Sequence, residues 1–139
     1  MGLDNGLLLH SKEPIEIPVE LSIVGFANYE ATSPFPYTYD ILYFRKCWNV
    51  RREVCTILGA SYEYCGKSWL TISEVKNMWR ALYELNSKKA WESGDSIWSY
   101  AEIKPRLDAS LLALEWLIDF MRKHEDKQNS FMVEFYDSY

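Results

Sequence analysis

The sequence predicts an α+β fold, because strand-like segments lie at both ends of the chain and helix-like segments lie between them. Apolar and polar residues alternate with period two near the N-terminus and again after residue 130, whereas apolar residues recur at helical spacing in the middle. Separate runs of strands and helices favour a small antiparallel or mixed sheet, built from N-terminal strands and a C-terminal strand and packed by three helices. A length of 139 residues suits a single domain, residues 1–139.

Four segments are expected to form the sheet. The clearest alternation starts at Ile15, and Pro18 within it indicates an edge strand or a bulge, since proline donates no backbone hydrogen bond. The stretch from 25 to 37 contains Pro34 and Pro36 and predicts a loop. The C-terminal strand must return to pair with the early ones. The predicted strands span residues 3–10, 15–23, 39–45 and 131–136.

Three helices are expected in the middle of the chain. The first carries an apolar stripe and is placed to end at Gly59. The second starts at a capping box, Thr71-Ile72-Ser73-Glu74. The third has Pro105 near its start and the widest apolar stripe, so it is expected to be the most buried. The apolar stripe of the first helix consists of Cys47, Val50, Val54 and Ile57.

The charge balance and the cysteines restrict the class of protein. A net charge of −5 argues against general nucleic-acid binding, which depends on Lys and Arg. No stretch approaches 18 apolar residues, so no membrane span is expected, and the first residues lack the features of a signal peptide. The three cysteines, Cys47, Cys55 and Cys65, include no CxxC pair and are expected to be reduced thiols. Reduced thiols predict a cytoplasmic location, which would be the host cytoplasm for a phage-encoded chain.

The sequence contains none of the common motifs of metal, nucleotide or hydrolase sites. His10 and His124 belong to no HExxH or Cys/His ligand pattern. The phosphate-binding patterns GxxxxGK(S/T) and GxGxxG and the hydrolase pattern GxSxG are absent as well. We therefore expect no metal and no cofactor, and we favour a non-enzymatic protein over an enzyme.

The most unusual segment is the junction between the third strand and the first helix, where four cations lie among large aromatic residues. Arg45 alternates with Tyr43 and Ile41, which places it on a face that is expected to be buried. A buried arginine requires a carboxylate partner or a bound anion. An ion pair with Glu134 or Asp137 is the commoner arrangement, and an anion site is the functional alternative.

Candidate ligand-binding residues surround Arg45. Asp4 and Asp137 would orient the cations, and the returning C-terminal strand could bring these two acids together. Paired carboxylates can perform acid–base or metal chemistry, although solvated strand ends are the simpler interpretation. Arg51 and Arg52 are expected on a solvated helix face. The candidate set is Arg45, Lys46, Trp48, Asn49, Asp4 and Asp137, with no catalytic or metal-binding residue assigned.

Three separated elements resemble a family of small phage and prophage proteins. Some members have a His in the helix that follows the second element, where this chain has Arg51 and Arg52. The resemblance implies a phage context rather than an activity, since that family has no assigned function. The elements are Met1-Gly2-Leu3-Asp4, then Tyr43-Phe44-Arg45-Lys46 followed by Trp48 and Asn49, and finally Phe135-Tyr136-Asp137-Ser138-Tyr139.

Three hypotheses about function follow from these observations. The preferred one is a non-enzymatic phage-type accessory protein that binds a host protein or a small anionic molecule, with the countering of host defence as one such role. The second is a small enzyme that uses Asp4, Glu134 or Asp137 as an acid or metal ligand, with Arg45 stabilising an anion. The third is a homo-oligomer that forms its contacts through the edge strand containing Pro18 or through aromatic residues of loops.

Overall fold

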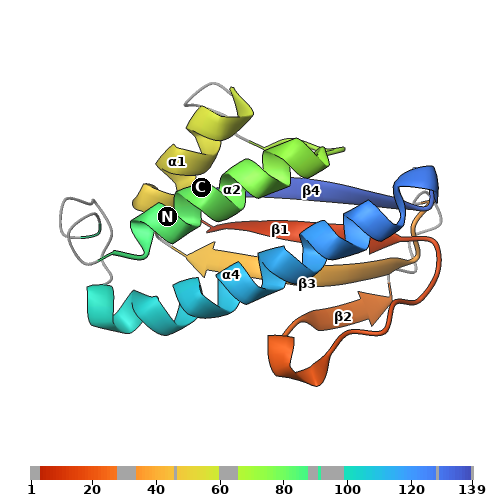
Figure 1. The fold of residues 1–139 in the computed structure, drawn as a ribbon, viewed down its shortest axis with the longest axis horizontal. Coiled ribbons are helices and arrows are strands. Elements are labelled where there is room, and N and C mark those ends of the chain that lie inside the picture. The colour runs from red at the N-terminus through yellow and green to blue at the C-terminus, as the bar shows by residue number, and fades with distance from the viewer. Residues whose placement is uncertain are drawn as a thin grey trace.

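The computed structural model describes residues 4–27, 34–45, 47–59, 66–87, 91, 99–127 and 129–138. These residues form the predicted α+β fold, with one antiparallel sheet and three long helices (Figure 1). The strands are β1 (Asp4–Ser11), β2 (Val24–Ala27), β3 (Tyr37–Arg45) and β4 (Phe131–Ser138). The helices are α1 (Trp48–Leu58), α2 (Ile72–Leu85) and α4 (Tyr100–Lys123), and two 3-10 turns are η1 (Val19–Leu21) and η2 (Glu125–Lys127).

The sheet has the strand order β2-β3-β1-β4, so the C-terminal strand pairs with the N-terminal strand at one edge. β1 pairs along its whole length with both β3 and β4. Its pairing with β3 shifts register between Leu7 and Leu8, where Ile41 is an extra residue in β3. Such a bulge interrupts the alternation of side chains between the two faces. As a result, the neighbours Ile41 and Leu42 are both buried.

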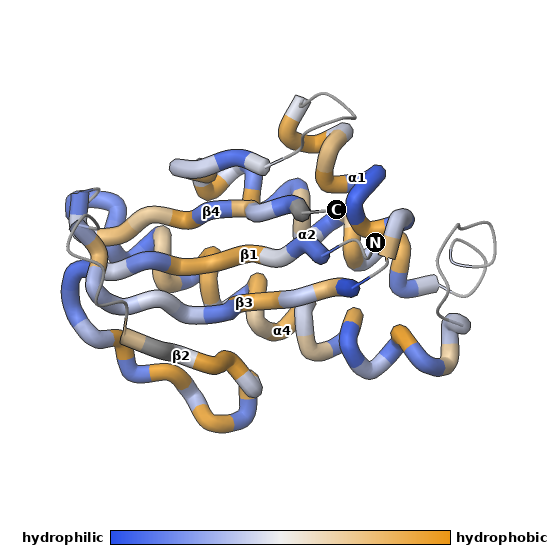
Figure 2. The backbone as a smooth tube through the Cα atoms, turned by 180° about the vertical axis from the view of Figure 1, so that it is seen from behind, coloured by the Kyte–Doolittle hydropathy of each residue, from blue (hydrophilic) through white to orange (hydrophobic). Residues whose placement is uncertain are grey.

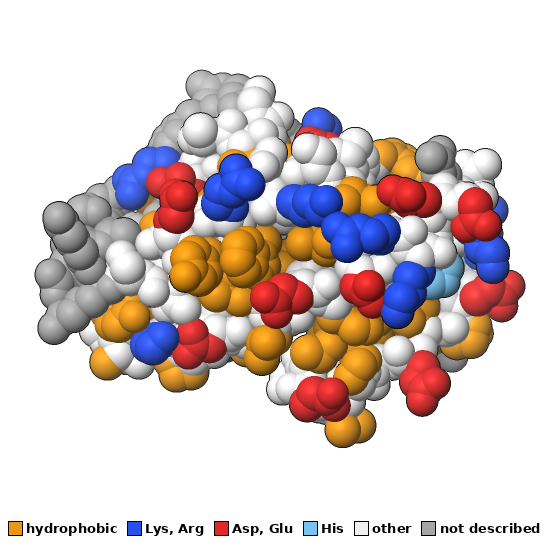
Figure 3. Space-filling view, in the orientation of Figure 1, with side chains coloured by type: hydrophobic (Ala, Val, Ile, Leu, Met, Phe, Trp, Pro, Cys, Tyr) orange, Lys and Arg blue, Asp and Glu red, His pale blue; other side chains and the backbone are white. Residues whose placement is uncertain are grey.

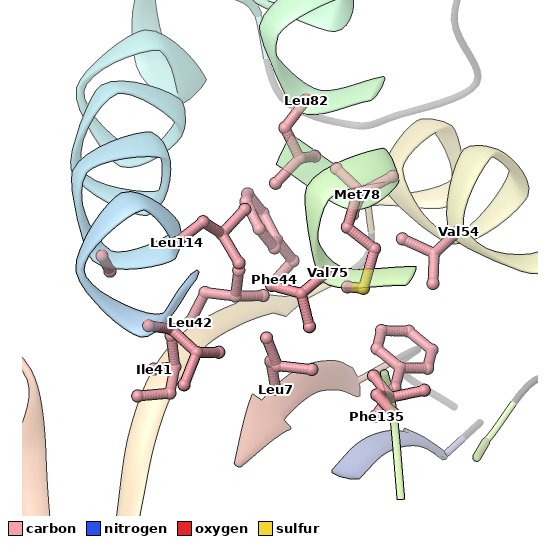
Figure 4. Packing of buried hydrophobic residues seen from close by; sticks show 14 of the residues in the cluster. Leu7, Ile41, Leu42, Phe44, Val54, Val75, Met78, Leu82, Leu114 and Phe135 are labelled. Carbon is pink, nitrogen blue, oxygen red and sulfur yellow. The ribbon is translucent and has the colours of Figure 1, made fainter. Parts of the chain in front are cut away.

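The helices cover one face of the sheet (Figure 1), and the core lies between the two layers. In the view from behind (Figure 2) the strands lie in front of the helices, and no described segment crosses over them. Leu7, Phe44 and Phe135 extend from the sheet toward Met78 and Leu114 of the helices (Figure 4). Burial of each such side chain contributes about 1.5–3 kcal/mol to folding. As far as the described residues show, the sheet therefore has one packed face and one open face.

The predicted strand over residues 15–23 is wrong. Proline cannot donate to a ladder, and Pro18 instead precedes η1 with φ −57° and ψ 131°. Ile15 and Ile17 are nevertheless partly buried against the core. The backbone N–H of Ile15 donates to the hydroxyl of Tyr39 at 2.7 Å. The alternation therefore marks an extended segment with one apolar side, and β2 follows it at the start of the predicted loop.

The helix ends agree with their capping signals. α1 ends before Gly59, which has φ 63°, a conformation that favours glycine. α2 starts at the predicted capping box, in which the Thr71 hydroxyl accepts from the N–H of Glu74 and the Glu74 carboxylate accepts from the N–H of Thr71. α4 starts earlier than its proline indicates, because Ser99 and Glu102 form a second capping box.

The prediction of three reduced cysteines is wrong. Cys55, which is buried in α1, is disulfide-bonded. Cys47 is buried and keeps its thiol, and Cys65 lies outside the described residues. The thiol-based reason for a reducing compartment therefore does not hold. Among the described helices, none combines the length and the apolar character that crossing a membrane requires.

Candidate functional site

Arg45, the centre of the predicted site, does not lie on the buried face. Its side chain is 62% exposed, and its Nε atom is 4.0 Å from Oδ1 of Asp4. The bulge at Ile41 is the physical reason, because it breaks the alternation on which the buried position depends. Arg45 instead shares the open face with Tyr43 and Asp4. Lys46, the next predicted residue, lies outside the described residues.

The buried arginine is Arg51, for which the sequence predicts a solvated position. Its side chain is 1% exposed, and Asp137 beside it is 0% exposed. The guanidinium donates from Nε to both carboxylate oxygens of Asp137 at 3.0 Å, and Nη2 lies 2.9 Å from Oδ2. Trp48 stacks near this group, with its ring centroid 5.8 Å from the guanidinium carbon, and Asn49 is fully buried. Two predicted residues, Trp48 and Asp137, therefore lie beside Arg51 rather than beside Arg45.

This buried ion pair joins α1 to the end of β4. Asn5 of β1 pairs in register with Asp137 and is fully buried as well. Neither its amide nitrogen nor its amide oxygen has a hydrogen-bond partner among the described residues. Water has no access to the charges of Arg51 and Asp137, so a ligand could not reach them without local unfolding. We therefore assign this cluster to structure and not to binding.

The carboxylates of the predicted acid site are dispersed. Asp4 pairs in register with Ser138, next to Asp137, but the two acids lie on opposite faces of the sheet. Glu134 is on the same face as Asp4, about 14 Å along the sheet by strand rise. Glu134 is held by His10, whose Nε2 atom lies 2.9 Å from it. Among the described residues, no group of three His, Cys, Asp or Glu is arranged to hold a metal ion.

His10 also has a hydroxyl partner, which completes a row of Thr38, His10 and Glu134 on the open face. His10 Nδ1 lies 3.0 Å from Oγ1 of Thr38. This order of hydroxyl, imidazole and carboxylate is the one that activates nucleophiles in hydrolases. Thr38, however, is only 2% exposed, so its hydroxyl is not presented to a substrate. The row is a hydrogen-bonded support of the sheet.

The centre of the open face is a phenol cluster, which consists of the phenols of Tyr43 and Tyr136 and the carboxylates of Asp4 and Asp40. Gly6 has no side chain, and the Tyr136 ring lies over it, so that a Cβ atom added to Gly6 would meet the Tyr136 hydroxyl at 2.7 Å. Burial raises the pKa of Tyr136, and the charges of Asp40, Tyr43 and Asp4 raise it further. Tyr43 donates to Asp4 at 2.5 Å, and this hydrogen bond raises the Tyr43 pKa. Both phenols therefore stay protonated at neutral pH, and Tyr43 donates its proton in the hydrogen bond to Asp4.

A cleft of about 560 Å³ opens beside this cluster, at the outer edge of β3. It lies between the first half of α4 and the segment of η1 and β2, which Figure 1 shows below β3. Its volume is in the range of ligand-binding pockets. The polar side chains that line it are Ser22, Asp40, Tyr43, Glu102, Arg106 and Ser110, and apolar side chains of η1, β2, β3 and α4 line the rest.

The cleft contains a length of sheet edge without a described strand partner. β2 pairs only with Tyr37–Asp40, and no described strand pairs with the outer side of β3 beyond that point. The carbonyl of Tyr43 points away from β1 and accepts from Nη1 of Arg106 at 2.8 Å. Because N–H and C=O of one strand residue point to the same side, the Tyr43 N–H also faces the cleft.

The opposite edge of the sheet is protected. The outer side of β4 pairs with Lys67, which donates to the carbonyl of Phe135 at 2.9 Å and accepts from its N–H at 2.8 Å. Leu70 donates to the carbonyl of Val133 at 3.0 Å. Proteins commonly cover their sheet edges in this way, because unpaired edges bind other chains. Within the described residues, the exposed part of β3 in the cleft therefore contrasts with the covered edge of β4.

Asp40 is the carboxylate at the wall of this cleft. Its side chain is half buried, and desolvation raises its pKa, while the nearby Arg106 lowers it in part. Its Oδ1 atom is buried and has no hydrogen-bond partner in the part of the chain that the structure describes. A carboxylate oxygen in this situation is expected to bind a hydrogen-bond donor when one is supplied.

Replacing Asp40 by asparagine is expected to stabilise the fold at neutral pH, by about 1–3 °C in the unfolding midpoint. The raised pKa means that Asp40 favours folding only when it is protonated, so its ionisation above that pKa costs stability. The half-exposed position keeps the effect small. Thermal unfolding at pH 7 and at pH 3 measures it, and the gain should vanish at the lower pH. The exposed Asp126→Asn serves as the control, and an equal gain from it would contradict the expectation.

Comparisons with known proteins identify no relative of this chain. No family model matches the chain, and neither a curated protein nor a solved structure matches it. The resemblance to phage proteins therefore stays a prediction. Function has to be inferred from the cleft and from the open face of the sheet.

Proposed function

We propose that this chain is a non-enzymatic binding protein, an accessory protein of the phage type, that recognises a host protein through the cleft beside β3. The observation that carries the proposal is the part of the β3 edge that has no described strand partner, which lies inside a cleft of about 560 Å³. Strand edges recognise extended segments of other proteins through backbone hydrogen bonds, and neighbouring pockets supply specificity. Countering a host defence is one role for such a complex.

The charges around the cleft favour a protein partner over a small anion. Asp40 and Glu102 line the cleft together with one cation, Arg106, which already donates to a backbone carbonyl. Arg45, the cation of the predicted anion site, is exposed and lies next to Asp4. On the helix-covered face, basic and acidic side chains are interspersed (Figure 3). None of these surfaces concentrates positive charge.

The other two hypotheses find less support. An enzyme that uses Asp4, Glu134 and Asp137 would need these acids in one place, and they lie in three different environments. A homo-oligomer formed through a strand at Pro18 lacks that strand. We propose the host cytoplasm as the location because the host partner would be there. The cysteines give no support for this location.

Affinity capture with matched cleft variants tests the proposal. Ala109 is exposed on α4 and lines the cleft, so Ala109→Trp is expected to block it. Ala101→Trp adds the same ring to the same helix outside the cleft and serves as the control. Tagged wild-type protein and Ala101→Trp should retain the same host protein from a lysate, and Ala109→Trp should retain at least tenfold less.

Two results would contradict the proposal. The first is capture of no specific protein by the wild type, and the second is equal capture by all three proteins. Circular dichroism establishes that the variants are folded. Light scattering on the wild type measures the homo-oligomer alternative, which a stable dimer that is lost in Ala109→Trp would support instead.

A further inference from the structure

We infer that the segment recognised by the cleft is an extended, basic peptide that adds to β3 as a strand and directs a Lys or Arg side chain toward Asp40. This inference rests on the proposed function and specifies the chemistry of the partner. It follows from three features of the cleft: its backbone donors and acceptors, its charge, and its apolar rim.

The backbone of β3 fixes the extended conformation of the partner. Beyond Asp40 the outer side of β3 has no described strand partner, and the N–H of Tyr43 faces the cleft. The place that an incoming strand would take is the continuation of β2, which pairs with the first part of the same edge. A segment bound there extends the sheet by one strand, as in other complexes formed by strand addition.

The charge of the cleft selects a cation. Two carboxylates, Asp40 and Glu102, line it against the single guanidinium of Arg106. The Oδ1 atom of Asp40 is a buried acceptor without a hydrogen-bond partner among the described residues. A Lys or Arg side chain in the cleft pairs with the accessible part of the Asp40 carboxylate and balances the excess negative charge, whereas an acidic side chain would add to it. Arg106 is the competitor, because its own cation occupies the same cleft.

Apolar side chains line the cleft on both sides of Asp40. Leu21 and Val24 line one wall of the cleft, and Val24 is 65% exposed. On α4, Pro105 and Ala109 line the facing wall. Exposed apolar side chains around a polar site are typical of interaction surfaces. The partner segment is therefore expected to alternate apolar residues with its basic one.

Selection from a random library of nine-residue peptides tests this inference, because the partner sequence is not needed. Peptides selected by mRNA display on the wild-type protein should carry Lys or Arg at a fixed position between apolar residues. Their affinity, measured by fluorescence anisotropy, should fall at least tenfold in Asp40→Asn and rise several-fold in Arg106→Gln. Hydrogen exchange should show protection of the Tyr43 amide on binding.

The outcomes separate the inference from the proposed function. Selected peptides that need the cleft but show no basic preference, and bind Asp40→Asn unchanged, would overturn the basic partner and leave binding at the cleft intact. Peptides that bind equally to Ala109→Trp, or no selected peptide at all, would overturn the proposed function itself. Tight binding without protection of the Tyr43 amide would overturn strand addition.

Discussion

Replacing Arg51 by methionine is expected to lower the free energy of unfolding by about 3–5 kcal/mol. The guanidinium is completely enclosed and makes a two-pronged ion pair with Asp137. Methionine fills much of the same volume but leaves the Asp137 carboxylate buried without its charge partner. Because a domain of this size is stable by about 5–15 kcal/mol, the loss is a large part of the total. Urea unfolding followed by tryptophan fluorescence measures it.

A double variant distinguishes two causes of the lost stability, the unpaired buried charge of Asp137 and the loss of side-chain packing. In Arg51→Met combined with Asp137→Leu, both members of the buried ion pair are removed together, so most of the lost stability should return. Arg80→Met, on the exposed side of α2, should change stability by less than about 0.5 kcal/mol. A loss below about 1 kcal/mol in Arg51→Met alone would show that the ion pair does not hold α1 to β4.

Arg45 and Arg51 show which features of the site the sequence pattern predicts correctly and which it does not. The pattern of the junction 43–52 predicts a buried arginine paired with an acid such as Asp137, and such a pair exists. The prediction assigns it to the wrong residue, because the bulge at Ile41 reverses the faces of β3 after that point. A bulge depends on pairing between distant strands, so no local periodicity contains it.

The helices and the strands β1, β3 and β4 are accessible to prediction for a local reason. The capping box at Thr71 and the glycine at 59 are signals within a few residues of the ends that they define. The alternation at 15–23 misleads because half-buried extended backbone has the same period as a strand, and only the prolines distinguish the two.

The cleft is not predicted by the sequence patterns, although one signal for it is present. Asp40 is the single charged residue before Arg45 in the apolar and aromatic run of β3, and a lone acid in such a strand requires a partner or a ligand. Two features of the cleft could not be predicted from the sequence. These are the early end of β2 and the contact of Arg106 of α4 with β3. Both are consequences of tertiary packing between segments that are far apart along the chain.

Replacing Gly6 by alanine is expected to destabilise the protein by about 2–3 kcal/mol, because no space exists for one methyl group. A Cβ at this position would lie 2.5 Å from the carbonyl oxygen of Leu42 and 2.8 Å from Cε1 of Tyr136. The first contact is with the backbone of the neighbouring strand, which cannot move without disturbing the pairing of β1 with β3. Thermal and urea unfolding of the variant measure the loss.

A second substitution distinguishes the two contacts. Tyr136→Ala removes the ring above Gly6, so adding it to Gly6→Ala relieves the contact with the ring but not the contact with the Leu42 carbonyl. If the backbone contact dominates, the double variant stays at least as unstable as Gly6→Ala, since it also loses the packing of the ring. Recovery of stability in the double variant would place the strain in the Tyr136 ring instead. In either case a loss in Gly6→Ala shows that close packing of β1 against its two neighbouring strands leaves no room for a Cβ atom at this position, whereas unchanged stability would contradict this packing.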